Sequence, residues 1–136
     1  MPAHLDETRR DPAYVNGRLF AVRESLQQWA LGDVNASIVD KFYERAATNP
    51  ASVAGVLDVL SKQHLNALKR KHGRSAFSAM DRRLTELNDL QGDAPGRLRD
   101  EGQAAWLAGY YQQRQHDFEQ RGKRSAAHNS GEPTDD

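Results

Sequence analysis

Apolar side chains recur along this chain at intervals of three and four residues, the spacing of one face of an α-helix. The clearest run lies near the start, where apolar residues fall at +4, +3, +4 and +3: Val15, Leu19, Val22, Leu26 and Trp29. No segment alternates apolar and polar residues over a useful length, which is the pattern of a half-buried strand. The chain is therefore predicted to be all-α.

Helix start and stop signals divide the chain into about five helices joined by short loops. The expected capping residues are Asp11, Asn35, Asn49 and Ser75, two of them placed before a proline that suits a first helical turn. The expected helix ends are Leu31, His72 before Gly73, and Gln120, and the last helix is expected to begin near Asp100. A compact bundle of about five helices is the predicted architecture.

The apolar spacing also predicts which side chains are buried. The core candidates on the later helices are Ile38, Val39, Phe42, Tyr43 and Ala46; Val53, Leu57, Leu60, His64 and Leu68; Phe77, Met80, Leu84 and Leu87; and Ala104, Leu107, Ala108, Tyr111 and Phe118. Three aromatic residues lie off these faces or at their edges: Tyr14, Trp106 and Tyr110. They could stack on bases or fill a contact with another subunit, and we favour the subunit contact.

The distribution of charge matters more than its total. The 136 residues carry 19 basic and 19 acidic side chains, so the net charge is zero, which argues against a nucleic-acid-binding protein. All of the basic residues lie between Arg9 and Arg124, however, and only 14 acids share that span, which leaves it with a charge of +5. The sequence thus predicts a flexible N-terminus (1–10), a helical-bundle domain (11–121) and a disordered C-terminal tail (122–136), with the excess of positive charge confined to the span from Arg9 to Arg124.

No pattern of catalytic or metal-binding residues stands out. The chain has no cysteine, which excludes a disulfide scaffold and thiolate ligands. Its histidines form no His-Glu-x-x-His or Glu-x-x-His pair, and His64 is interpreted as a core residue. No glycine-rich phosphate loop is present. We expect no enzyme activity, no cofactor, no metal and no small-molecule substrate.

The sequence shows neither a signal peptide at its start nor an apolar run long enough for a membrane helix. A cytoplasmic protein without membrane partners is the expectation.

Basic residues form the most suggestive pattern. Six cations but a single acid, Asp81, lie between positions 69 and 83, around the turn between the third and fourth helices. Such a cluster attracts polyanions, although solvated helix ends explain the same residues equally well. The candidate nucleic-acid-binding residues are Lys69, Arg70, Lys71, Arg74, Arg82 and Arg83 at this turn, Arg114, Arg121, Lys123 and Arg124 near the end of the last helix, and Arg18 and Arg23 on the first helix.

Several short segments carry a family resemblance. They are Val15-Asn16-Gly17-Arg18-Leu19-Phe20-Ala21, Val34-Asn35-Ala36-Ser37-Ile38 before Phe42-Tyr43, Asn49-Pro50, His64-Leu65, and Gly109-Tyr110-Tyr111-Gln112-Gln113-Arg114-Gln115. In this order and spacing they resemble the C-terminal region of the large subunit of the type I-C CRISPR Cascade complex, which can also be made as a separate small subunit. The length, and Met1 just before the matching region, lead us to expect the free small subunit. One departure is Gln112, where the family commonly has a histidine.

The resemblance implies a non-catalytic role. Small subunits of this kind are helical bundles that pack along the backbone subunits holding the guide RNA and stabilise the R-loop, mainly through the displaced non-target DNA strand. The implied partners are the backbone subunits, the large subunit, another copy of the chain and the R-loop itself. The alternative is a helical structural adaptor that makes only protein–protein contacts. The glycines Gly17 and Gly109 are best explained by close helix packing.

Overall fold

The computed structural model describes residues 4–130, and the side chains of residues 4–122. Over this range the chain forms five α-helices and no strand, which confirms the predicted all-α bundle. The helices are α1 (Pro12–Leu31), α2 (Ile38–Thr48), α3 (Ala51–His72), α4 (Arg74–Gln91) and α5 (Asp100–Ser130).

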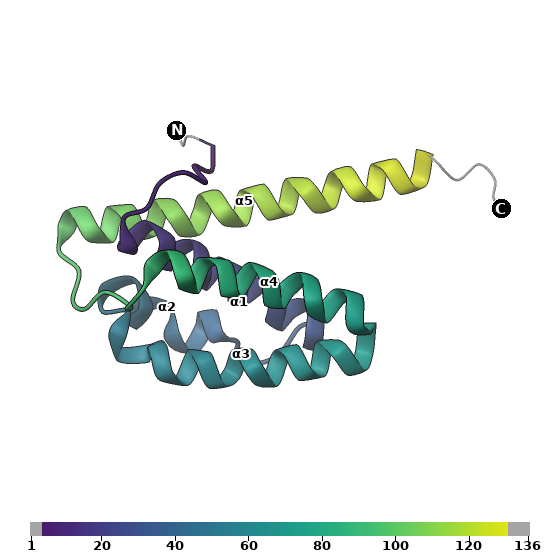
Figure 1. Cartoon of the computed structure of the whole chain (residues 1–136), viewed down its shortest axis with the longest axis horizontal. Helices are drawn as coiled ribbons and strands as arrows, with labels where there is room; N and C mark the ends of the chain where they lie inside the picture. The colour runs from purple at the N-terminus through teal and green to yellow at the C-terminus, as the bar shows by residue number, and fades with distance from the viewer. Residues whose placement is uncertain (1–3, 131–136) are drawn as a thin grey trace.

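The first helix is the centre of the bundle. α1 contacts each of the other four helices and is buried over most of its length. Figure 1 shows α5 along one edge of the bundle and α3 along the opposite edge, with α1 between them. α4 and α5 both pack on α1 but share no close backbone contact, so a space between them is left for side chains.

Three helix starts differ from the predictions. Pro50, not Asn49, is the residue that precedes α3, and Asn49 is the C-cap of α2. Ser37, not Asn35, caps α2: its Oγ accepts a 3.3 Å bond from Asp40 N–H, and its own N–H donates to the Asp40 carboxylate at 3.2 Å. Gly73 both ends α3 and precedes α4, so Ser75 lies inside α4. The chain reverses through this single residue because its φ of 95° is one that glycine adopts readily.

The last helix is longer than predicted. α5 continues to Ser130 instead of ending near Gln120, so residues 122–130, assigned to a disordered tail, are helical here. The backbone meets no proline before Pro133, and Ala126 and Ala127 are strong helix formers. Residues 131–136 lie outside the described part of the chain. Figure 1 shows the end of α5 extending past the other helices.

The predicted buried faces of α2, α3 and α4 agree with the structure, but that of α5 is wrong. Its buried aromatic residues are Trp106 and Tyr110, at 0% and 3% exposure, whereas Tyr111 and Phe118 are 52% and 64% exposed. Leu107 is exposed with them, and Tyr14, expected at the surface, is fully buried on α1.

Close contact between α1 and α5 explains this face of α5. A Cβ atom added to Gly17 would lie 2.1 Å from the carbonyl oxygen of Trp106, and one added to Gly109 would lie 2.1 Å from that of Tyr14. The two helices therefore cross backbone to backbone, as the glycines predicted. This geometry brings Trp106 Nε1 within 2.8 Å of Asn16 Oδ1, to which it donates.

Gln112, the departure from the family pattern, lies at the same helix pair. Its Oε1 accepts a 2.6 Å hydrogen bond from the Tyr14 hydroxyl. The amide thus has a structural role between α1 and α5.

Candidate nucleic-acid interface

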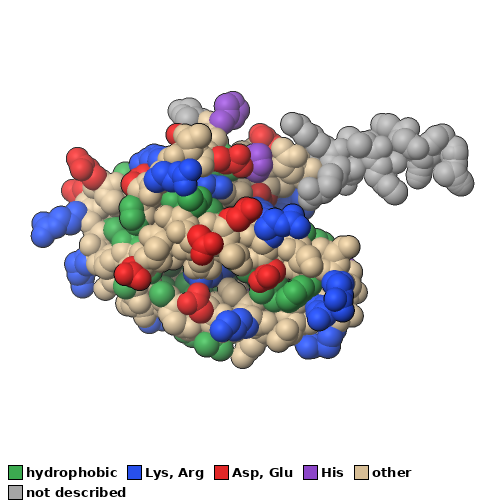
Figure 2. Space-filling view, in the orientation of Figure 1, with side chains coloured by type: hydrophobic (Ala, Val, Ile, Leu, Met, Phe, Trp, Pro, Cys, Tyr) green, Lys and Arg blue, Asp and Glu red, His purple; other side chains and the backbone are tan. Residues whose placement is uncertain are grey.

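Five exposed cations surround the α3–α4 turn, and we call them the turn cluster: Lys69, Arg70, Lys71, Arg74 and Arg82. Within the described residues, no carboxylate lies within the 4.0 Å of an ion pair from any of them. Figure 2 shows Lys and Arg side chains gathered where α3 meets α4, while charges of both signs are mixed over the rest of that face. The turn cluster is therefore an accessible region of positive potential.

Helix stability accounts for part of the turn cluster. Lys69, Arg70 and Lys71 lie in the last turn of α3, where cations interact favourably with the helix dipole. Arg74 is the first residue of α4, where a cation is unfavourable, and no acid shares that first turn. Arg74 thus adds positive charge at a place where helix stability does not call for it.

Arg83, predicted to belong with these residues, is engaged elsewhere. Its Nη2 donates to both carboxylate oxygens of Asp117 on α5, at 2.8 and 2.9 Å. Asp117 also accepts a 3.0 Å bond from Gln113 Nε2. This charge-assisted contact ties α4 to α5 and leaves Arg83 less able to contact a phosphate.

The predicted basic patch on α1 is not on the surface. Arg18 and Arg23 are 7% and 5% exposed, so the expectation of a third surface patch is wrong. Arg23 pairs with Asp58 at 2.5 Å, and its Nε donates to Ser61 Oγ at 3.2 Å. Burial lowers the pKa of both guanidinium groups. The spacing of apolar residues did not predict the burial of Arg18 and Arg23, because polar side chains fill the contacts of α1 with α3 and α5.

The predicted basic residues on α5 are divided. Arg114 and Arg121 are exposed, but Arg114 Nε lies 3.6 Å from the Glu24 carboxylate. The Arg121 guanidinium lies 6.0 Å from the centre of the Phe118 ring, a cation–π distance. Lys123 and Arg124 are on the helix, but their side chains are outside the described part.

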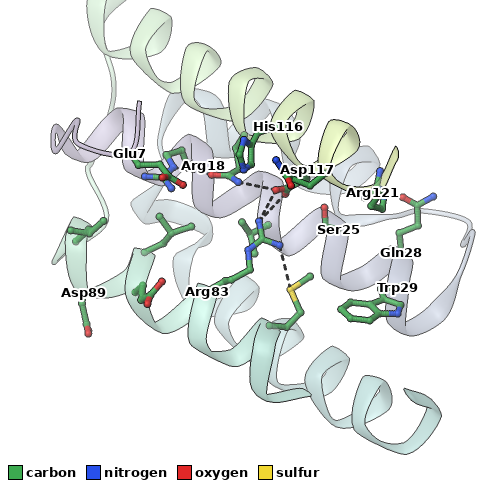
Figure 3. A pocket seen from close by; sticks show the side chains of 17 residues that line it. Glu7, Arg18, Ser25, Gln28, Trp29, Arg83, Asp89, His116, Asp117 and Arg121 are labelled. Atoms are coloured by element: carbon green, nitrogen blue, oxygen red, sulfur yellow. Dashed lines mark hydrogen bonds and ion pairs between the residues drawn. The ribbon is translucent and has the colours of Figure 1, made fainter. Parts of the chain in front are cut away.

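A cleft of about 1100 Å³ lies between α1, α4 and α5. The Arg83–Asp117 ion pair crosses its middle, with Glu7, Arg18 and His116 toward one end (Figure 3). Trp29 lies toward the other end (Figure 3). The lining of the cleft mixes acids and bases, whereas the turn cluster contains only cations.

Trp29 was predicted to lie in the core, and that prediction is wrong. It follows the α1 apolar stripe, but α1 ends two residues later, and the ring is 42% exposed. Its ring centre lies 5.7 Å from that of His72, next to the turn cluster. His64, the histidine predicted to be in the core, is buried, and burial lowers its pKa.

In the part of the chain that the structure describes, no group of three His, Cys, Asp or Glu side chains comes together in a way that could hold a metal ion. None of the helices in that part is both long and apolar enough to span a membrane.

Comparison with protein families decides what kind of protein this is. Residues 1–118 match the family model described as CRISPR-associated protein (Cas_Csd1). The chain belongs to this CRISPR-associated family. The Cas_Csd1 match confirms the CRISPR part of the resemblance found in the sequence, and it associates the chain with other CRISPR proteins. No curated protein matches the chain.

Proposed function

We propose that this Cas_Csd1 family member is a non-catalytic small subunit of a type I-C Cascade complex. It packs along the backbone subunits, beside the large subunit and another copy of itself, and stabilises the R-loop by contacting the displaced non-target DNA strand. The observation that carries the DNA contact is the turn cluster, whose five exposed cations have no described carboxylate partner. Family membership supplies the CRISPR context.

Modest phosphate contacts are sufficient for this role. An RNA–DNA heteroduplex is about as stable as the DNA duplex that it replaces, so R-loop formation is nearly balanced. A few cations along the displaced strand shift that balance without reading its sequence. The overall neutrality of the chain fits an auxiliary contact inside a larger assembly better than an independent DNA-binding protein.

The alternative function is a structural adaptor that contacts only proteins. The outer face of α5 favours it, because Leu107, Tyr111 and Phe118 are exposed there in a row at helical spacing. Exposed apolar side chains of this kind are common at subunit contacts. The two functions use different faces and are separated by the experiment below.

The test measures the salt dependence of binding between the full-length chain and a fluorescent single-stranded DNA. If each cation of the turn cluster contacts one phosphate, log K should fall with log salt with a slope of about −3.5, from roughly −0.7 per phosphate. Replacing Arg70, Lys71 and Arg74 by Ala should reduce the slope to about −1.4. Lys69 is retained because its Nζ lies 5.2 Å from the Phe77 ring centre and supports packing.

The matched control replaces Lys62, Arg97 and Arg99 by Ala. These three cations are also exposed, and no described carboxylate pairs with them. The control should retain the parent slope and, in a reconstituted complex, the parent level of R-loop. An equal loss in both triple variants, or no loss in either, would assign the turn cluster no role at DNA and favour the adaptor.

A further inference from the structure

Trp29 is exposed beside the turn cluster. The chain has two tryptophans, and the other one, Trp106, is fully buried with its indole N–H bonded to Asn16. Trp29 lies near the end of α1 with 42% of its surface exposed. Leaving so large an apolar ring in water is unfavourable unless a partner covers it.

The surroundings of Trp29 indicate the chemistry of that partner. Its ring packs at a 41° angle on His72, with 5.7 Å between the centres, and His72 directly follows Lys71 in the last turn of α3. Toward α5, Trp29 shares its end of the cleft with Gln28 and Arg121 (Figure 3). Arg121 therefore lies on the α5 side of the exposed ring, and the basic last turn of α3, which carries Lys69, Arg70 and Lys71, lies on the side of His72.

An exposed aromatic ring among cations is the arrangement that single-stranded nucleic acids recognise. The cations follow the phosphates, while the ring offers a flat surface on which any base can stack. A protein partner would be favoured by mixed charges, but in the cleft Glu7 and Asp89 lie toward the end away from Trp29 (Figure 3). Asp117 is paired with Arg83. The turn cluster, on the other side, has no described carboxylate partner.

We propose that Trp29 stacks on a base of the single-stranded DNA whose phosphates contact the turn cluster, with His72 supporting the ring from the side. This inference rests on the proposed function and adds a second kind of contact to it. Stacking does not depend on base identity, so the site needs no preferred sequence. It also releases no counterions, so the salt slope does not depend on it.

The experiment uses the full-length chain and oligothymidylate of about 15 nucleotides, near the upper size of single-strand sites. Oligothymidylate should quench the fluorescence of the wild-type chain, whereas Trp29→Phe, which emits from buried Trp106 alone, should show no quenching. Trp29→Ala should bind about 10-fold more weakly, equivalent to about 1.4 kcal/mol, with an unchanged salt slope. Trp29→Phe keeps an aromatic ring and should retain most of the affinity, which also covers the case in which the Ala variant folds poorly.

Each outcome bears on the inference. If the wild-type chain binds with the expected salt slope but shows no quenching, and both variants bind as tightly, stacking is refuted while the proposed function stands. If the wild-type chain does not bind at all, both fall. If the Trp29 variants bind DNA normally but fail to assemble with protein subunits, the ring contacts protein and the inference is overturned.

Discussion

The crossing of α1 and α5 depends on Gly17 having no side chain, and Gly17→Ala tests this directly. The added Cβ would lie 2.1 Å from the carbonyl oxygen of Trp106, and ordinary contact begins at 3.4 Å, so the helices must separate by about 1.3 Å. The obstacle is backbone, which cannot rotate away as a side chain can. The separation would stretch the 2.8 Å bond between Trp106 and Asn16 and the 2.9 Å bond from Arg18 Nε to Gln113.

The expected cost combines three effects. Overpacking costs about 2 kcal/mol, and two weakened hydrogen bonds cost about 1 kcal/mol each. Replacing Gly by Ala inside a helix returns about 1 kcal/mol. The net loss in the free energy of unfolding of Gly17→Ala is therefore about 3 kcal/mol, or roughly 12 °C in Tm at about 4 °C per kcal/mol.

Gly55→Ala is the matched control. Gly55 lies inside α3, and nothing lies within 4 Å of a Cβ added there. This variant gains helix propensity without a clash and should raise Tm by roughly 4 °C. Thermal unfolding followed by circular dichroism measures both variants. If Gly17→Ala melted close to the parent while Gly55→Ala rose as expected, the close crossing of α1 and α5 would be wrong.

Three further outcomes follow. Adding Gly109→Ala to Gly17→Ala should cost less than the sum of the single effects, since one helix separation relieves both clashes. Asp117→Ala should lower the free energy of unfolding by about 1–3 kcal/mol in urea titrations, because Arg83 loses its partner, whereas the exposed Glu119→Ala should change it by less than about 0.5 kcal/mol. Burial lowers the pKa of His64 in the folded chain, so the unfolded chain binds more protons below about pH 6.5, and stability should fall as the pH drops; His64→Gln should weaken this dependence, and an unchanged pH profile would contradict it.

Much of the fold could be predicted from residue spacing. α1 to α4 carry apolar residues at intervals of three and four, and their buried faces agree with this spacing apart from Trp29, because a helix in a bundle turns its apolar side inward. The close approach at Gly17 and Gly109 also agrees with the prediction, although a glycine inside a helix does not by itself require one, since Gly55 meets nothing within 4 Å.

The face of α5 could not be predicted in this way. Its most apolar stripe, with Leu107, Tyr111 and Phe118, is exposed, while Trp106 and Gln113 are buried against α1. Burial here depends on where the backbone of α1 comes closest, and hydropathy does not contain that information. Polar side chains are tolerated at these buried positions where they bond across the two helices, as Arg18 Nε does to Gln113 and Trp106 does to Asn16, although Arg18 Nη1 is buried without a partner in the described part of the chain.

The candidate nucleic-acid interface could also be predicted only in part. A run of cations around Gly73 is visible in the sequence, and the turn places Lys69, Arg70, Lys71 and Arg74 at the surface because helix ends are exposed there. The sequence by itself thus determined the helical class, most buried faces and the basic turn, all of which depend on neighbours a few residues away. Tertiary structure alone decided that Arg18 and Arg23 are internal, that Arg83 binds Asp117, and that Trp29 is exposed beside His72. These are contacts between residues tens of positions apart, and they depend on how the helices cross.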